Sequence, residues 1–301
     1  MNKCHHTHKM ENIYESAGFS KQAHIQYMNR RSIEENLVNI VINSIIGVRQ
    51  MHNFMGLKKI YYLLKPDMIG RDRFIEIGMD YNLGIKRLIS YCRTTFSCKS
   101  HRFTNLTAGV EIKDINQMWV SDITYFRVDE IFYYLTFIED VYSRRILGYT
   151  VSRSLAADAN CIALNMALKV RSGNDLRGLI HHSDRGTQYI SDKYLKILND
   201  NNIEVSMCNS VYENTHIERL NGIIKNEYLK DKPIKTYEDL QKYLKQSVIL
   251  YNEERPHWKL YGQAPVSFEK ELPSIPMKER KVLVLYSEKS SSYVQDTLYE
   301  E

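Results

Sequence analysis

Three acidic residues occupy positions at which a carboxylate could do chemistry. Asp122 lies inside the apolar run Trp119–Phe126, where an uncompensated charge is costly to bury. Asp184 ends a second apolar run, and Glu218 lies in the first turns of a long helical segment. If the fold brings the three together, they would repel one another unless a divalent cation neutralised them. Magnesium fits best, with manganese as a substitute, and two such ions could promote in-line displacement at phosphorus.

Two of the acids also have ordinary structural explanations. The segment Thr215–Glu218 matches a capping box, in which Glu218 would only bind backbone N–H groups at the start of its helix. Asp184 is a common residue type for a turn at the end of a strand. Asp122 is different, because a carboxylate within an apolar strand needs compensation of its charge. For Glu218 and Asp184, the residue types therefore leave both a structural and a catalytic role open. For Asp122, a purely structural role is harder to justify.

The helix expected from about Thr215 to Lys230 presents two neighbouring stripes. Its apolar stripe consists of Ile217, Leu220, Ile224 and Tyr228. Its polar stripe consists of Glu218, Asn221 and Lys225, and this stripe can face the edge of a sheet. We expect Lys225 to contact a DNA phosphate near the scissile bond. The further candidates for DNA contact around the acids are Asn221, Arg185 and Arg219.

For two other groups of potential metal ligands, we expect a role other than metal binding. His181 and His182 are adjacent in a strand, so they face opposite sides and cannot easily chelate one ion. A second group, consisting of Cys4, His5, His6 and His8, could bind zinc, but near the chain's start it is more typical of a polar tail. The five cysteines include no CxxC pair, so we expect neither disulfides nor a thiolate zinc site.

The chain from Asn116 onward predicts an α/β domain. Strands are expected at 119–126, 131–138, 145–152, 178–184 and 203–207, and helices at 156–170, from 191, at 215–230 and from 237. Three antiparallel strands followed by alternating helices and strands predict a ribonuclease H-like mixed five-stranded sheet flanked by helices. This domain is assigned to residues 116–275. Residues 276–301 are expected to form an irregular, frayed tail.

Residues 1–115 predict an α-helical, helix-turn-helix region. Gly18 and Ser20 precede a short helix that runs toward Tyr27, and apolar residues over 55–64 recur at helical spacing before Pro66 and Gly70 break the helix. We assign residues 1–34 to a first helix-turn-helix segment, 35–95 to a second DNA-binding domain of this type, and 96–115 to a basic linker. A small helical bundle without DNA contacts explains the same periodicity.

Charge is concentrated in the N-terminal part of the chain. Residues 1–115 contain 17 lysines and arginines against 10 acidic residues, whereas the whole chain has a net charge of +5. Between Tyr81 and Val110 the basic residues alternate with aromatic ones, and Lys86, Arg87 and Arg93 are the candidate DNA contacts. A solvated linker is the alternative. No apolar run suits a membrane span or a secretory signal, so we expect a cytoplasmic protein without a membrane partner.

Several ordered motifs resemble a known family. They are Trp119–Tyr125, Ile138–Arg144, His182–Tyr189, Tyr212–Gly222, and Tyr251–His257 followed by Leu260 and Pro265. In these motifs the chain resembles the integrase-core transposases of bacterial insertion sequences, specifically the OrfB protein of the two-frame insertion-sequence family three. The likeness covers about residues 117 to 270. The helical region near 40–90 is similar to the family's extra helix-turn-helix module, though less closely.

The resemblance implies a function. The family's acidic triad falls on Asp122, Asp184 and Glu218, which would hold the metal ions and cut a phosphodiester at the end of the mobile element. The freed 3′-hydroxyl would then attack another DNA strand, giving DNA transposition, integration and recombination. The family also implies terminal inverted repeats and target DNA as partners, a homo-multimer on DNA, and an OrfA partner or frameshift fusion. OrfA would supply a leucine zipper, a heptad run that this chain lacks.

Two further functions are compatible with the same fold. A DNA-binding regulator could have kept the fold of an inactive transposase, but the intact triad argues against it. A structure-selective nuclease could use the same carboxylates, yet the C-terminal motif from Tyr251 to Pro265 looks specific to transposition. The active transposase is the interpretation that uses all the motifs.

Overall fold

The computed structural model describes residues 14, 16–85, 103–208 and 214–285. The chain divides into two compact units, one formed by Met1–Met51 with Gly56–Ile85 and the other by His52–Met55 with Lys86–Glu301. Among the described residues, no helix is both long enough and apolar enough to cross a lipid bilayer.

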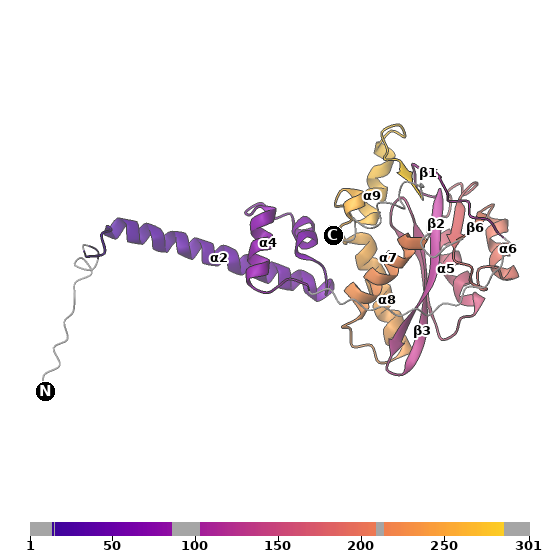
Figure 1. Ribbon diagram of the computed structural model, residues 1–301, viewed down its shortest axis with the longest axis horizontal. Helices are drawn as coiled ribbons and strands as arrows, with labels where there is room; N and C mark the ends of the chain where they lie inside the picture. The colour runs from indigo at the N-terminus through magenta and orange to yellow at the C-terminus, as the bar shows by residue number, and fades with distance from the viewer. Residues whose placement is uncertain (1–13, 15, 86–102, 209–213, 286–301) are drawn as a thin grey trace. The chain divides into compact units, whose positions relative to one another are not determined.

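A five-stranded mixed sheet forms the centre of the second unit (Figure 1). Its strands are β2 (Met118–Val128), β3 (Ile131–Asp140), β4 (Ile146–Ser152), β5 (Ile180–Ser183) and β6 (Glu204–Met207). They lie in the order β4-β3-β2-β5-β6, with β2, β3 and β4 antiparallel and with β5 and β6 parallel to β2. The predicted ribonuclease H-like sheet is therefore confirmed in its strand number, its meander and its crossovers.

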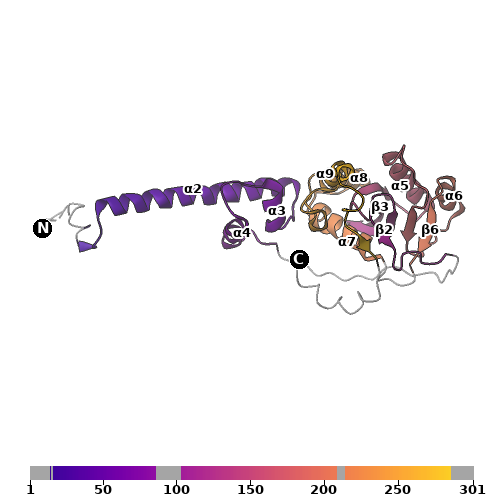
Figure 2. The same cartoon turned by 90° about the horizontal axis from the view of Figure 1, so that it is seen from above.

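Helices cover both faces of this sheet. In both views α5 (Ala157–Val170) and α6 (Asp192–Asp200) lie on one face, and α7 (Thr215–Ile223) and α8 (Tyr237–Glu253) lie on the other (Figures 1 and 2). Helix α5 lies very close to β4 at Gly148, where an added methyl group would come within 1.9 Å of the carbonyl oxygen of Ala163. Because every other residue carries a Cβ, only glycine permits this contact.

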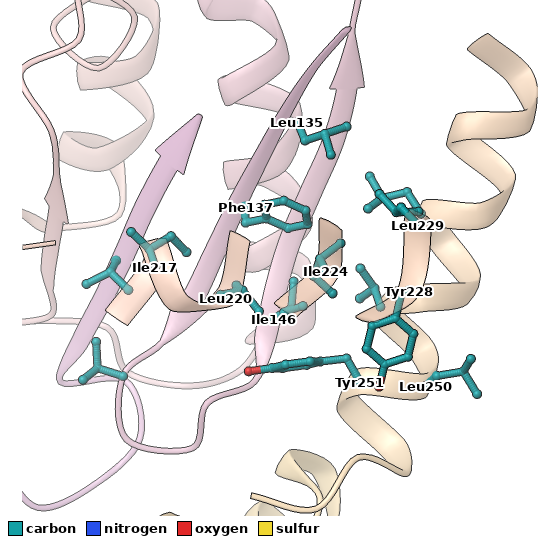
Figure 3. Packing of buried hydrophobic residues seen from close by; sticks show 14 of the residues in the cluster. Leu135, Phe137, Ile146, Ile217, Leu220, Ile224, Tyr228, Leu229, Leu250 and Tyr251 are labelled. Carbon is teal, nitrogen blue, oxygen red and sulfur yellow. The ribbon is translucent and has the colours of Figure 1, made fainter. Parts of the chain in front are cut away.

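The core between the sheet and α7 contains the apolar stripe expected from the sequence. Ile217, Leu220 and Ile224 are at most 1% exposed, and they pack against Leu135 and Phe137 of the sheet (Figure 3). Burial of such side chains stabilises a fold by roughly 2 kcal/mol each. This packing fixes the rotation of α7 about its axis, and thereby the direction in which its polar stripe points.

The long helix expected over 215–230 is not regular. After α7 the chain continues as a π-helix, η2 (Ile224–Leu229). A π-helical turn is rare and is frequently found at functional sites. It begins at Ile224, a buried residue of the apolar stripe, and it contains Lys225 of the polar stripe.

The end of the chain is more ordered than expected. The segment after α8 contains η3 (Trp258–Leu260), α9 (Pro265–Glu271), η4 (Leu272–Ser274) and β7 (Leu283–Val284). Strand β7 pairs antiparallel with β1 (Glu111–Ile112). The stretch from residue 276 that we expected to be irregular therefore contains one short strand, Leu283–Val284, and the segment at 111–112, which we assigned to the linker, belongs to this second sheet. Residues 286–301 lie outside the described part.

The first unit contains α2 (Lys21–Met51), α3 (Leu57–Leu64) and α4 (Arg71–Asp80). As expected, Ser20 caps the first of these, because its Oγ accepts a hydrogen bond of 3.1 Å from the backbone N–H of Ala23. The short helix expected to end near Tyr27 is instead the start of a 31-residue helix. The boundary expected between residues 34 and 35 therefore falls inside α2, a correction to the division into two helix-turn-helix segments.

The three helices of the first unit share a small apolar core. Its fully buried members include Val41 and Ile45 of α2, Ile60 of α3, and Phe74 and Ile77 of α4. Helix α4 begins at Arg71, directly after Gly70, as the sequence predicts. The core lies at the C-terminal half of α2, so the N-terminal half extends beyond α3 and α4 (Figures 1 and 2).

Candidate active site

Asp122 lies in the middle of β2, on the sheet face that α7 covers. It is opposite Phe137 in the ladder and shares its face with Thr124. The carboxylate Oδ2 accepts a hydrogen bond of 2.7 Å from the side-chain amide of Asn221 on α7. Desolvation raises the pKa of Asp122 well above its usual value, and the negative charges of Asp184 and, to a smaller extent, Glu218 raise it further.

Asp184 lies beside Asp122 because of the strand register. Strand β5 is parallel to β2 with Ser183 paired to Ser121, and each aspartate directly follows one of these serines. Burial raises the pKa of Asp184, and the backbone N–H of Gly186 opposes this shift by donating a 3.0 Å hydrogen bond to Oδ1. A methyl group at Gly186 would come within 3.0 Å of the same oxygen. The turn after β5 is thus built around the carboxylate.

Glu218 is exposed on the first turn of α7, yet its carboxyl is shielded enough to raise its pKa. The capping-box alternative receives no support, since the helix N-cap is Asn214 and no side chain caps the N-terminus of α7. The carboxylate that approaches Asp122 from this helix is therefore not occupied with the backbone N–H groups of the helix start.

The charges of Asp184 and Glu218 act on Asp122, but the three carboxylates are too far apart to bind one metal ion together. Within the ranges that the structure describes, no group of three or more His, Cys, Asp or Glu side chains is close enough to hold a metal ion. The side-chain oxygen Oδ1 of Asn221 is buried beside Asp122 and has no hydrogen-bond partner among the described residues. All of these potential ligands are oxygen atoms, and the carboxylates repel one another. Both properties suit a hard divalent cation, which would bring the three acids closer together.

Lys225 extends the polar stripe of α7 into η2. Its ammonium donates a 2.8 Å hydrogen bond to Oγ1 of Thr124 and lies 5.4 Å from the ring centroid of Tyr125. Desolvation lowers the pKa of Lys225, and the nearby charge of Asp122 partly opposes this effect. Our sequence analysis missed Thr124, although the two-residue alternation of a strand already places it on the same face as Asp122.

The backbone beneath the acids is held by a small polar network. Ser121 donates a 2.9 Å hydrogen bond to the carbonyl oxygen of Phe137, and its Oγ lies 2.9 Å from the hydroxyl of Tyr189. Asn214 donates to the carbonyl oxygen of Ser121 at 3.4 Å. These bonds connect β2, β3, the loop after β5 and the start of α7, so they position all three segments that carry the acids.

The other candidate DNA contacts have varied surroundings. Arg185 donates a 2.7 Å hydrogen bond from Nε to the carbonyl oxygen of Cys208, and Arg219 is exposed on α7. Asn221, which we expected to contact DNA, has its amide bound to Asp122 inside the protein. Lys86, Arg87 and Arg93 lie outside the described residues.

His181 and His182 are part of the core and point to different partners, as expected for neighbours in a strand. The Nε2 atom of His181 lies 2.9 Å from the hydroxyl of Tyr194, and burial lowers the pKa of His181 to about 3. The ring of His182 lies 2.9 Å from Ser206 Oγ and 3.1 Å from Cys208 Sγ. The described residues thus give both imidazoles structural partners. Cys4, His5, His6 and His8 lie outside the described residues.

Glu139 is a buried carboxyl that our sequence analysis did not single out. It is 2% exposed on β3 and shares the α7-facing side of the sheet with Val120. Burial raises its pKa to about 7, although the nearby charges of Arg144 and Arg219 lower it. The only sequence signal is an acidic residue at the end of an apolar strand next to Asp140.

Comparison with known proteins assigns this chain to a family. The chain matches the family described as Integrase core domain over residues 113–211, and a second family of the same description over residues 201–265. The two matches together extend from the start of the sheet to the first residue of α9. They include the segments that carry all three acids.

The similar proteins come from insertion sequences. The uncharacterized 31 kDa protein of insertion element IS600 from Shigella sonnei is 29% identical over 249 residues, which cover 79% of this chain and 86% of that protein. A transposase-like protein of Haemophilus influenzae is 33% identical, with 51% of this chain and 70% of that protein covered. Transposase InsF for insertion sequence IS3A of Escherichia coli is 34% identical, and the chain spans about half of its length, 54%.

A solved structure resembles the chain as well. It is the simian T-cell lymphotropic virus intasome in complex with a PP2A regulatory subunit, with 17% sequence identity, a TM-score of 0.48, and coverage of 79% of this chain and 78% of that one. The relatives and the matched family agree with the architecture of the sheet. The chain belongs to the insertion-sequence transposases of the IS3 type, enzymes with an integrase core that cut and join DNA strands during transposition.

Proposed function

We propose that this transposase uses Asp122, Asp184 and Glu218 as the ligands of two divalent ions, magnesium or manganese, and cuts DNA at the ends of its element. The freed 3′-hydroxyl then attacks target DNA. The observation that carries this assignment is the parallel pairing of Ser121 with Ser183, because it sets Asp122 and Asp184 side by side. Bound ions would neutralise the carboxylates and stabilise the charge that develops on the phosphodiester.

The chain's own residues hold and orient the reactants. Asn221 positions Asp122, since its amide donates to Oδ2 and leaves Oδ1 of the carboxylate free of this bond. The ammonium of Lys225 donates to Thr124 and makes a cation–π contact with Tyr125. In the complex with DNA, a phosphate oxygen takes the place of the threonine hydroxyl as its acceptor. Arg185 and Arg219 extend this positive surface along the DNA backbone.

The remaining assignments complete the proposal. The helical unit, together with the basic segment around Lys86, Arg87 and Arg93, binds the terminal inverted repeats. An OrfA partner or a frameshift fusion supplies further recognition of the repeats. The protein acts as a homo-multimer on DNA, in the cytoplasm where its substrate lies.

The test is a strand-cleavage and strand-transfer assay with purified protein, OrfA, terminal-repeat DNA and magnesium or manganese. Asp122→Asn should abolish both reactions while DNA binding persists, because it removes a metal ligand and leaves the basic surface intact. Asp231→Asn, at an exposed position after η2, is the matched control and should retain activity. A protein that regulates through binding alone would be unaffected by Asp122→Asn, and absence of all cleavage by the wild type would end the proposal.

A further inference from the structure

The C-terminal motif from Tyr251 to Pro265 takes no part in the proposed chemistry, but it helps to form a cavity. The cavity lies between the turn that joins β3 to β4, the turn after η3, and α9 with the segment that follows it. Its apolar lining includes Tyr142, Leu260, Phe268 and Leu272. The charged residues of the lining are Arg144, Lys259, Arg280 and Lys281, with Glu279 as the one acid that the structure describes there. We call this cavity the Tyr261 pocket, after the exposed aromatic residue of its lining.

The Tyr261 pocket has more positive charge than its surroundings neutralise. Arg280 is paired, since its guanidinium lies 2.5 Å from Oδ2 of Asp114. Among the described residues, no carboxylate forms an ion pair with Arg144, Lys259 or Lys281. The chain from residue 116 onward has 24 lysines and arginines against 26 acidic residues, so its average composition does not explain this local excess. Cations gathered in a partly apolar recess attract an anion.

Tyr261 has a backbone conformation that a tyrosine rarely adopts. Its φ of 58° and ψ of 32° are left-handed, Gly262 follows with a φ of 79°, and the N–H of Gln263 donates to the carbonyl oxygen of Leu260 at 3.0 Å. These are the features of a type I′ turn, which prefers asparagine, aspartate or glycine where this chain has tyrosine. The side chain is 74% exposed, so burial does not compensate this strain. A closed turn thus presents an aromatic ring to solvent beside unpaired cations.

Arg144 connects the Tyr261 pocket to the helix that carries Glu218. Its guanidinium contacts Nδ1 of His216, which lies in the first turn of α7, two residues before Glu218. Desolvation lowers the pKa of His216 well below its usual value, and the charges of Arg144, Arg219 and Lys259 lower it further, so all three cations lie near this ring. The pocket is therefore next to the start of α7, and DNA that is cut at the acids would pass within reach of it.

A nucleotide with an unpaired base is the ligand that suits all of these features. Lysine and arginine bind its phosphate, and an exposed aromatic ring provides a surface on which its base stacks. A paired duplex presents phosphates too, but its base faces are covered by neighbouring bases. The exposed ring of Tyr261 therefore favours an unpaired nucleotide over a duplex backbone.

We propose that the Tyr261 pocket binds an unpaired nucleotide of the substrate DNA beside the cut, with the base stacked on Tyr261 and its phosphate near Arg144 and Lys259. The inference rests on the proposed function in one respect, because the proposed acids define where the cut lies. The binding itself needs neither a metal ion nor an acid of the triad, so it can be measured without cleavage.

Binding of two short DNA duplexes to the full chain, in buffer without metal ions, tests the proposal. One duplex is fully paired, and the other has the same length but mismatched bases at one end. Stacking tolerates any sequence, so the duplexes need not contain the terminal repeats. The wild type should bind the mismatched end more tightly, by roughly tenfold for one stacked base. A fluorescent base analogue placed among the unpaired bases should be quenched on binding, because stacking quenches it.

Substitutions of Tyr261 separate stacking from bulk. Tyr261→Ala should abolish both the preference for the mismatched end and the quenching, whereas Tyr261→Phe should keep both, because phenylalanine retains the ring. Tyr261→Leu keeps an apolar side chain without a ring and should behave like Tyr261→Ala. Met277→Ala removes a side chain that is 51% exposed and lies outside the lining of the pocket, so it should change neither measurement. Melting temperatures verify that each variant is folded.

A lysine of the lining tests the phosphate contact. Lys259→Gln should weaken binding to the mismatched duplex and reduce the slope of log affinity against log salt by about 0.7, the value for one contact to a single strand. Lys278→Gln, at an exposed position of the same C-terminal segment outside the lining, is the matched control and should bind like the wild type.

Three outcomes would overturn the proposal. They are equal affinity of the wild type for the two duplexes, a preference that folded Tyr261→Ala retains, and a preference that Tyr261→Leu retains as fully as Tyr261→Phe. If Tyr261→Ala does not fold, the comparison of phenylalanine with leucine decides. Asp122→Asn should keep the preference for the mismatched end, so a failure of the proposed catalytic site is measured separately, as cleavage that does not depend on Asp122.

Discussion

Ser121 and Ser183 are partners in the parallel ladder between β2 and β5, and the next residue of each strand is one of the two aspartates of the site. Parallel strands end at the same edge of a sheet, so one register decides whether the two carboxylates meet. Slipping the pairing by one residue would turn one aspartate to the other face of the sheet. The proposed catalytic pair therefore depends on the register of β5 as much as on the two acids.

The contact between Asn221 and Asp122 leads to a first prediction. Asn221→Ala removes the 2.7 Å hydrogen bond, and losing such a bond to a charged group costs about 1.5–3 kcal/mol, or roughly a tenfold or larger fall in the rate of strand cleavage. DNA affinity should hardly change. The measurement is single-turnover cleavage together with a binding assay. Asn226→Ala, at an exposed position on the next turn, is the control, and an equal loss in both variants would contradict the positioning role.

A second prediction concerns Lys225. If its ammonium exchanges Thr124 for a DNA phosphate, Lys225→Ala should weaken binding to all DNA sequences similarly and reduce the slope of log affinity against log salt by about 1. Binding titrations at several salt concentrations measure this slope. Lys230→Ala, an exposed lysine at the end of η2, serves for comparison. An unchanged salt dependence for Lys225→Ala would show that the lysine serves only to hold Thr124.

Glu139 gives a prediction on pH. Its pKa rises from 4.5 to about 7 on folding, so the folded state favours the protonated carboxyl. The free energy of unfolding should therefore fall as the pH rises from about 4.5 through 7, and this loss is complete above 7. A tenfold change in an acid dissociation constant corresponds to about 1.4 kcal/mol.

Glu139→Gln removes this titration and keeps the shape of the side chain. It should be more stable than the wild type at pH 8 by on the order of a few kcal/mol, and the difference should shrink toward pH 5. Urea unfolding of both proteins at the two pH values measures it. A stability difference that is the same at both values would show that Glu139 does not titrate in this range.

The close contact between β4 and α5 supports a prediction on stability. Gly148→Ala would place a methyl group 1.9 Å from the backbone carbonyl of Ala163, so the helix would have to shift away from the sheet. We expect a destabilisation of about 3 kcal/mol or more, visible as a lower melting temperature. Gly222→Ala, which has no neighbour nearer than 4.0 Å in its helix, should be neutral or slightly stabilising. Similar effects for the two substitutions would contradict the tight packing.

The sequence predicted the catalytic fold well because alternation and apolar runs are local signals. Apolar residues that recur every second residue or form short runs predict the five strands. Apolar residues that recur about every three and a half residues predict the helix stripe of Ile217, Leu220 and Ile224. The three acids were chosen from their positions within those elements and from the family resemblance, and their catalytic role stays a prediction. Thr124 could also have been found, since it lies two residues from Asp122.

Other features depend on contacts that no local pattern records. The length of α2 was underestimated, because Gly18 and Ser20 mark the start of the helix while nothing in the sequence near Tyr27 stops it. The π-helical turn at Ile224–Leu229 and the pairing of β7 with β1 arise from packing between distant segments. Arg185 and Asn221 have partners in other elements, which their residue types alone did not indicate.

The two-stranded sheet has a practical consequence for work on an isolated catalytic fragment. Glu111 and Ile112 precede the first strand of the main sheet and pair with Val284 and Leu283, which follow the last helix of the chain's described part. A fragment cut at residue 275 would therefore leave β1 with an open edge and uncover Ile112, which is fully buried in the intact chain. Expression boundaries for an isolated catalytic domain belong before residue 111 and after residue 285.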